Sequence, residues 1–257
     1  MYLGLEKGVA LVTAASRGIG RATAERLAAE GMTVIAASRS AGGDPETIGP
    51  GSIVPLGHDL SDVAATAELV DTVVARFGAL DVLVINTPGP RILPVLDVGW
   101  DDWCVAHDML LRPVVQLAGA AGRTMRDKGA GSIILLSSTW VRQPAAGGVL
   151  SASYRSAASA FAKTLATELA PAGVRVNQVM PGATGTARMY GIVEMKSGAN
   201  GTTVDEEIAR VVADIPVGRW AEATEIADAV AFLASPRASF ITGASVPVDG
   251  GALRAGH

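Results

Sequence analysis

The sequence predicts a single-domain α/β fold built on a doubly wound parallel sheet. Short apolar runs alternate along the chain with segments of helical periodicity, the pattern of strand–helix–strand crossovers. Hydrophobic residues make up 49% of the chain but aromatic residues only 4%, so the core is mainly Ala, Val, Leu and Ile, which suit strands covered by helices on both faces. No repeat or linker divides the chain, so residues 1–257 are predicted to form one domain.

Each expected element has its own local signal. Short buried runs predict seven strands, at residues 9–13, 33–37, 53–56, 82–85, 133–136, 174–179 and 244–248. Apolar positions at helical spacing predict five helices, at residues 21–30, from a cap at Ser61 to a stop at Gly78, and at residues 100–126, 151–169 and 224–233. A Gly/Pro-rich stretch at 41–51 interrupts the pattern. Residues 187–215 show weak periodicity and are expected to form short helices or a lid over a substrate site.

Composition excludes several classes of function. The net charge is −4 and no basic tract interleaves with aromatics, so no nucleic-acid partner is expected. Cys104 is the only cysteine and the three histidines are scattered, so neither an internal disulfide nor a metal site is expected. No apolar run is long enough to span a membrane, and the first residues lack a signal-peptide pattern. We therefore expect a cytoplasmic protein with no membrane partner.

A glycine-bearing turn, TAASRGIG at residues 13–20, follows the first strand and leads directly into a helix. Gly18 and Gly20 would let the backbone approach a diphosphate closely, and the helix N-terminus would offer N–H groups and partial positive charge. A turn of this kind after the first strand of an α/β series predicts dinucleotide binding on a Rossmann-type sheet.

The end of the second strand predicts which dinucleotide binds. An acid that would hold the ribose hydroxyls of NAD(H) is missing there, because the strand ends in Ser38-Arg39. Arg39 and Arg17 instead offer guanidinium groups that suit a 2′-phosphate. NADP(H) is therefore the expected cofactor, and NAD(H) is less favoured.

Several motifs together resemble the short-chain dehydrogenase/reductase family, and are similar to 3-oxoacyl-carrier-protein reductases over nearly the whole length. They are TAASRGIG (family TGxxxGxG, with Ala14 at the first glycine), His58-Asp59-Leu60, Asn86, Ser137-Ser138, Pro181-Gly182 with Thr186, and the C-terminal stretch at 215–251. The resemblance implies cofactor contacts at Thr13, Ser16, Arg17, Gly18, Ile19, Gly20, Ser38, Arg39, Asp59, Leu60, Asn86, Arg155, Pro181, Gly182 and Thr186.

The active-site pattern departs from this family, which uses a Ser, a Tyr, a Lys and an Asn. No Tyr-x-x-x-Lys occurs in the chain. The stretch FAKTLA at 161–166 resembles the family segment after that pair, which sets the register and places Ser151 at the Tyr position and Arg155 at the Lys position. Leu110 falls at the Asn position, so Ser138 alone of the four is kept.

The remaining candidates for catalysis divide the roles among them. Ser138 would polarise the substrate oxygen, and Arg155 would keep the cationic role and set the cofactor ribose. Proton supply is left open among Tyr154, Ser151 and water. Tyr154 falls on nearly the same helix face as Ser151, and the adjacent Arg155 is expected to lower its pKa, although a packing role for Tyr154 is the alternative.

Two functions from different classes remain open. The first is an NADP(H)-linked oxidoreductase that acts on a small-molecule ketone or secondary alcohol. The second is a dinucleotide-binding protein of the same fold that performs non-redox chemistry, as a cyclase or isomerase, or senses a ligand. The helix at 151–169 and the C-terminal segment resemble family surfaces that pack across symmetry axes, which implies a homotetramer or homodimer.

Overall fold

Eight strands form one sheet in the computed structural model, which describes residues 2–40 and 42–254. Their order across the sheet is β3-β4-β2-β1-β5-β6-β7-β8, and every pairing is parallel except that of β3 with β4. The strands are β1 (Val9–Thr13), β2 (Thr33–Ser38), β3 (Glu46–Ile48), β4 (Gly51–Gly57), β5 (Val82–Ile85), β6 (Gly131–Leu136), β7 (Val174–Pro181) and β8 (Ser245–Val248). The order reverses between β1 and β5, which makes this the point where an open α/β sheet binds its ligand.

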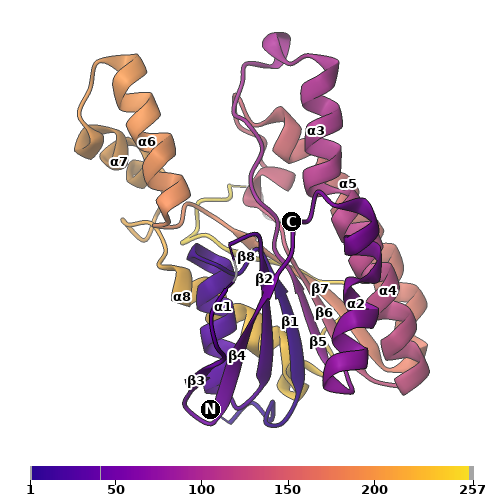
Figure 1. Cartoon of the computed structure of the whole chain (residues 1–257). Helices are drawn as coiled ribbons and strands as arrows, with labels where there is room; N and C mark the ends of the chain where they lie inside the picture. The colour runs from indigo at the N-terminus through magenta and orange to yellow at the C-terminus, as the bar shows by residue number, and fades with distance from the viewer. Residues whose placement is uncertain (1, 41, 255–257) are drawn as a thin grey trace.

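Helices cover both faces of the sheet (Figure 1). The helices are α1 (Gly18–Ala29), α2 (Val63–Phe77), α3 (Trp100–Leu110), α4 (Arg112–Lys128), α5 (Val149–Leu169), α6 (Ala187–Asn200), α7 (Val204–Ala213) and α8 (Ala223–Ala234). In β1, Leu11 packs in the cluster formed with α2, α4 and α5, whereas Ala10 and Val12 pack in the cluster formed with α1 and α8. Because successive strand residues point to opposite faces, burial on both faces explains the unbroken apolar runs. The doubly wound sheet is confirmed.

All seven expected strands are present, and the structure adds an eighth. This additional strand, β3, lies inside the Gly/Pro-rich stretch at 41–51, of which residue 41 is outside the described residues. Glu46 and Thr47 are exposed, and β3 pairs with β4 alone at the edge of the sheet. Only Ile48 of this three-residue strand packs against the core, so the strand is too short to leave a hydrophobic period in the sequence.

Three helix predictions need correction. The helix expected at 100–126 is two helices that meet at Leu111, because Pro113 in the first turn of α4 has no N–H to continue the bonding of α3. Helix α1 begins at Gly18 and not at residue 21. The cap of α2 is Asp62 and not Ser61: the Asp62 carboxylate accepts from the Ala65 N–H at 3.0 Å.

Residues 187–215 contain the helices α6 and α7, so the expected short helices are confirmed. Figure 1 shows this pair (orange) standing beyond the carboxyl ends of the strands, at the same end of the molecule as α3. Helix α7 begins with a capping box formed by Thr203 and Glu206, which fixes its start next to the end of α6. Within the described residues, no helix is long and apolar enough to cross a membrane.

The corrected cap gives a stability prediction. We expect Asp62→Ala to lower the free energy of unfolding by about 1 kcal/mol, because it removes the side-chain acceptor at the start of α2. Ser61→Ala is the matched control and should cost clearly less, since the Ser61 hydroxyl only donates to Asp59. Urea unfolding of both variants measures the difference. Equal losses, or a larger loss for Ser61→Ala, would contradict the assignment of the cap.

Candidate active site

Two hydrogen bonds join the strand ends at the point where the sheet order reverses. The Thr13 hydroxyl donates to the backbone oxygen of Asn86 at 2.7 Å and accepts from the Asn86 N–H at 3.0 Å. Thr13 is fully buried at the end of β1, and Asn86 follows β5 directly. These bonds hold the two strand ends together, so a ligand that binds here meets a fixed edge.

The turn after β1 leaves no space for additional side chains. Ala14 has a φ of 48° and Gly18 a φ of 57°, both in the left-handed region. The Asn86 side-chain amide donates to the Ala14 carbonyl at 3.3 Å. A Cβ atom at position 20 would overlap that carbonyl oxygen and lie 2.8 Å from the Asn86 amide nitrogen, so only glycine fits.

The start of α1 is arranged for an anion. Ser16 and Arg17 are exposed, Ile19 packs against the core, and the cap residue Arg17 makes no side-chain hydrogen bond to the helix N-terminus. The first backbone N–H groups of α1 therefore remain free to donate hydrogen bonds, beside the partial positive charge of the helix N-terminus. This glycine cradle and helix start fit the diphosphate of a dinucleotide.

The predicted adenosine end lies at the carboxyl ends of β2 and β4. Ser38 is buried, and Arg39 and Asp59 are exposed. The backbone N–H and hydroxyl of Ser61 donate to the Asp59 carboxylate, and these bonds, with the nearby charge of Arg39, lower the pKa of Asp59. The side chain of Leu60 is buried in the core. Arg39 therefore has an anionic neighbour in the segment after β4, but its own strand supplies no acid.

Ser138, Ser151 and Arg155 lie around the end of β6. The Ser138 hydroxyl oxygen accepts from the Trp140 N–H at 3.2 Å, which leaves the hydroxyl proton for another acceptor. The Arg155 guanidinium donates to the Leu136 carbonyl at 2.8 Å, and its Nε donates to the Ser151 hydroxyl oxygen at 3.3 Å. Ser151 is 8% exposed. The two residues expected at the family's Tyr and Lys positions thus form one hydrogen-bonded pair.

The environment of Arg155 is unusual for an arginine. Burial, and then the positive charge of Arg188, lower the pKa of Arg155 to about 10. Among the described residues, no carboxylate forms an ion pair with Arg155. Arg155 is half-buried, and a partly desolvated cation without a counter-ion is costly, so its position favours a ligand with polar or anionic oxygens.

The expectation that Arg155 lowers the pKa of Tyr154 is wrong. Burial, with smaller effects of Cys104 and Asp108, raises the pKa of Tyr154, whereas we expected Arg155 to lower it. The reason is the direction of the two side chains: Arg155 reaches toward β6, while the Tyr154 ring makes edge contacts with Trp103 and His107 of α3, at centroid distances of 5.7 and 5.8 Å.

The residue expected at the family's Asn position is apolar and buried. Leu110 is 1% exposed and is the last residue of α3. Its side chain cannot donate or accept a hydrogen bond, so it offers no polar group to a ligand.

The segment after β7 reaches the glycine turn from the other side. Pro181 ends β7, and a Cβ at Gly182 would lie 2.8 Å from the Asp249 Cβ, so the chain passes close to the residue after β8. Thr186 caps α6 by accepting from the Met189 N–H at 3.4 Å. The Thr186 methyl carbon would lie 3.4 Å from a Cβ at Gly18. The structure therefore brings both predicted motifs, residues 13–20 and 181–186, to one site.

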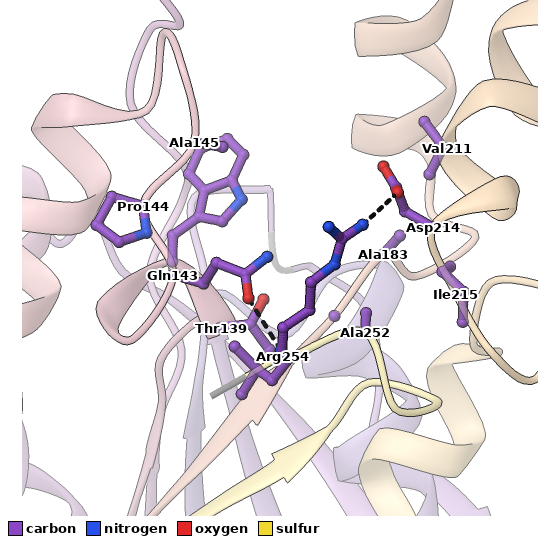
Figure 2. Close-up of a pocket in the computed structure, with 13 residues that line it drawn as sticks. Thr139, Gln143, Pro144, Ala145, Ala183, Val211, Asp214, Ile215, Ala252 and Arg254 are labelled. Carbon is purple, nitrogen blue, oxygen red and sulfur yellow. Dashed lines mark hydrogen bonds and ion pairs between the residues drawn. The ribbon is translucent and has the colours of Figure 1, made fainter. Parts of the chain in front are cut away.

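A cavity of about 210 Å³ opens beside the turn that follows Ser138; Thr139 lines it, but Ser138 itself does not (Figure 2). Trp140 and Gln143 line one side, and the end of α7 at Val211 and Asp214 lines the other. Arg254 of the C-terminal segment lies between these sides: its N–H donates to the Gln143 side chain at 3.0 Å, and its guanidinium pairs with Asp214 at 2.9 Å. Gln143, Asp214 and Arg254 were missed from sequence because they lie at least 40 residues apart, with no spacing that relates them.

Comparisons with known proteins agree with this geometry. A family model described as enoyl-(acyl carrier protein) reductase matches residues 13–252. The short-chain reductase protein NovJ of Streptomyces niveus is 38% identical over 96% of this chain and 94% of its own. The chain belongs to the short-chain dehydrogenase/reductase family. It is thus of an NAD(P)-dependent class of enzyme.

Other members of the short-chain dehydrogenase/reductase family are also similar. The 3-oxoacyl-[acyl-carrier-protein] reductase FabG of Vibrio harveyi is 36% identical over 97% of this chain and 98% of its own. The crystal structure of L-sorbose reductase from Gluconobacter frateurii, complexed with NADPH and L-sorbose, has a TM-score of 0.90 at 26% identity and covers 99% of this chain and 100% of its own. The Rossmann-type fold expected from the sequence is confirmed.

The left-handed residue in the turn gives a second stability prediction. We expect Ala14→Gly to raise the free energy of unfolding by roughly 0.5 to 1 kcal/mol, because relief of the left-handed strain outweighs the added chain entropy of glycine. Ala15→Gly is the control and should destabilise, since Ala15 is buried and has no positive φ. Thermal unfolding compares the two. A lower stability for Ala14→Gly would show that the turn is not strained.

Proposed function

We propose that this chain is an NADP(H)-linked oxidoreductase that reduces a ketone or oxidises a secondary alcohol. One observation carries the proposal: three features lie together at the carboxyl ends of β1, β5 and β6. They are the glycine turn at residues 13–20, the hydrogen bonds between Thr13 and Asn86, and Ser138, whose hydroxyl proton has no acceptor among the described residues. The L-sorbose reductase of similar structure is complexed with NADPH, which supports this cofactor.

The choice of NADP(H) over NAD(H) rests on charge at the adenosine end. Arg17 and Arg39 are exposed there, and neither forms an ion pair with a described residue. Ser38 is buried at the strand end where an NAD-preferring site would place an acid. Guanidinium groups bind phosphate through charge-assisted hydrogen bonds, so they would favour the 2′-phosphate.

In the proposed mechanism the residues of the β6 end orient and polarise the substrate oxygen. When bound, the dinucleotide supplies or accepts hydride. Ser138 would donate its hydroxyl proton in a hydrogen bond to the oxygen, where negative charge develops during reduction. Arg155, held by the Leu136 carbonyl, would place a positive charge under the site and bind ribose hydroxyls.

For proton supply the geometry favours Ser151 or a water molecule over Tyr154. The Ser151 oxygen already accepts from Arg155, so its own hydroxyl proton is available to a substrate oxygen or water. An alkyl hydroxyl is a far weaker acid than a phenol, and we infer that Ser151 passes on a proton from water. Tyr154 is assigned a packing role, because its ring contacts α3 and its pKa is raised.

The cavity beside the turn after Ser138 is the proposed site for a small-molecule substrate. Its walls combine the apolar side chains of Trp140 and Ile215 with the polar groups of Gln143 and the Asp214–Arg254 pair. The end of helix α7 supplies one wall, which supports the prediction that residues 187–215 form a lid over the substrate. Self-association as a dimer or tetramer also stays a prediction.

A second candidate function is non-redox chemistry or ligand sensing on the same cofactor-binding fold. One observation favours it: positions 110, 151 and 155 together hold no phenol, no amine and no amide, while the glycine cradle is intact. NADPH oxidation in the presence of a panel of ketones separates the two candidates. Cofactor binding without turnover of any ketone would favour the second.

The charge at the adenosine end predicts cofactor preference. We expect the parent protein to bind NADPH more tightly than NADH, and Arg39→Asp to weaken NADPH binding while sparing or improving NADH binding. A carboxylate at this position would repel the 2′-phosphate and could hold ribose hydroxyls. Fluorescence titration of both cofactors measures this. Tighter binding of NADH by the parent would contradict the proposal.

The altered pair predicts a gain of activity. Ser151→Tyr combined with Arg155→Lys should raise the rate of ketone reduction by NADPH by about a hundredfold, because a positioned general acid contributes on the order of 10² or more. Steric conflict between the larger phenol and a pocket shaped for serine would make the gain smaller. Steady-state rates with intact NADPH binding test it, and no increase would mean that the missing pair does not limit the chemistry.

The same assay examines Tyr154. Tyr154→Phe keeps the ring contacts with α3 and should turn over at the parent rate. A strong fall in kcat with unchanged NADPH affinity would instead identify Tyr154 as the proton donor.

A further inference from the structure

Arg188, in the first turn of α6, reaches across to the segment that follows β5. Its two terminal nitrogens donate to the Gly89 carbonyl at 3.1 Å and the Pro90 carbonyl at 2.9 Å. A Cβ atom at position 89 would overlap the Arg188 guanidinium, so the glycine permits this close packing. The contact joins residues almost 100 positions apart and connects α6 to the β5 end of the cofactor crevice.

This bridge lies beside the glycine turn. Thr186, two residues before Arg188, caps α6 and lies in van der Waals range of position 18. Gly89 lies three residues beyond Asn86, which is bonded to Thr13 and Ala14. Arg188 therefore connects the two sides of the region in which the glycine turn presents the helix N–H groups.

The charges of this region are not balanced. Among the described residues, neither Arg188 nor Arg155 forms an ion pair with a carboxylate. Arg188 is an exposed residue overall, and partial desolvation of its guanidinium lowers its pKa. The pKa of Arg155 is lowered first by desolvation and then by the positive charge of Arg188. The Thr87 hydroxyl, in the same segment as Gly89, is buried without a hydrogen-bond partner. Two like charges and an unpaired hydroxyl would be stabilised by an anionic group.

We propose that Arg188 binds the diphosphate bridge of the dinucleotide. The inference rests on the proposed cofactor binding and adds a residue of α6 to the glycine turn of α1. Its Nε, which has no partner among the described residues, and its positive charge would face the phosphate oxygens while the terminal nitrogens keep their bonds to Gly89 and Pro90.

An anionic group of the substrate is the other source of the same chemistry. The diphosphate is favoured because Arg188 adjoins the Thr186–Gly18 contact, whereas it does not line the cavity beside the turn after Ser138. Probes that carry or lack the bridge can separate the two sources.

The experiment compares Arg188→Gln with the parent by calorimetric titration of three probes. NADPH and ADP-ribose carry the diphosphate bridge, and adenosine 2′-phosphate lacks it. We expect Arg188→Gln to weaken NADPH and ADP-ribose by roughly ten- to a hundredfold, as for a lost charge-assisted bond, and to leave adenosine 2′-phosphate unchanged. The NADPH affinity should also become less sensitive to salt.

Lys196→Gln is the matched control, because it removes one positive charge from the exposed part of the same helix and should change none of these affinities. Arg188→Lys keeps the charge but loses the forked guanidinium, and it should retain more NADPH affinity than Arg188→Gln. If Arg188→Gln fails to fold, Arg188→Lys is compared with the parent instead, and it should bind NADPH and ADP-ribose more weakly than the parent does.

Several outcomes would overturn the inference. Parent-like binding of NADPH and ADP-ribose by Arg188→Gln would do so. Equal weakening of all three probes, including adenosine 2′-phosphate, would also do so, because the effect would then not depend on the diphosphate bridge. If the parent binds none of the three probes, the proposed cofactor function fails as well. If the parent binds all three probes, the proposed cofactor binding stands, and the comparison with Arg188→Gln then tests the role of Arg188 alone.

Discussion

The paired hydrogen bonds between Thr13 and Asn86 are the interaction on which the rest of the site depends. They join β1 and β5 where the strand order reverses, the one place along this sheet edge where consecutive crossovers leave in opposite directions. The Asn86 amide then holds the carbonyl of Ala14, and Gly20 packs against both groups. The position of the helix N-terminus, and therefore of any phosphate bound there, follows from this small set of contacts.

One arginine organises the region around the end of β6. Arg155 uses its forked guanidinium to bond both the Leu136 carbonyl and the Ser151 hydroxyl oxygen. In the register that we propose, Ser151 and Arg155 stand at the family's Tyr and Lys positions, so the site would keep a positive charge and lack a phenolic acid. Neither side chain contacts Gly20 or the carbonyl of Ala14, so the glycine turn does not depend on them.

Charge is distributed differently on the two sides of Ser138. On the cavity side, Arg254 is paired with Asp214, so the wall is close to neutral. On the side of the glycine turn, Arg155 and Arg188 have no carboxylate partner among the described residues. An anionic cofactor and a substrate of moderate polarity match this division, because the unbalanced positive charge is confined to the side where phosphates are expected.

The sequence by itself determined the alternation of strands and helices and the glycine turn, because each is encoded by local periodicity or by a short motif. The register of Ser138, Ser151 and Arg155 against the family motif stays a prediction. Only the tertiary structure decided the directions of side chains that depend on distant neighbours. Tyr154 packs on Trp103 and His107, some 50 residues earlier, and Arg188 bonds a segment almost 100 residues away. The edge strand β3 and the break before Pro113 also escaped prediction, since one is too short to leave a hydrophobic period and the other interrupts a continuous apolar period. Local patterns fix which elements form, but the partners of long side chains depend on how those elements pack in space.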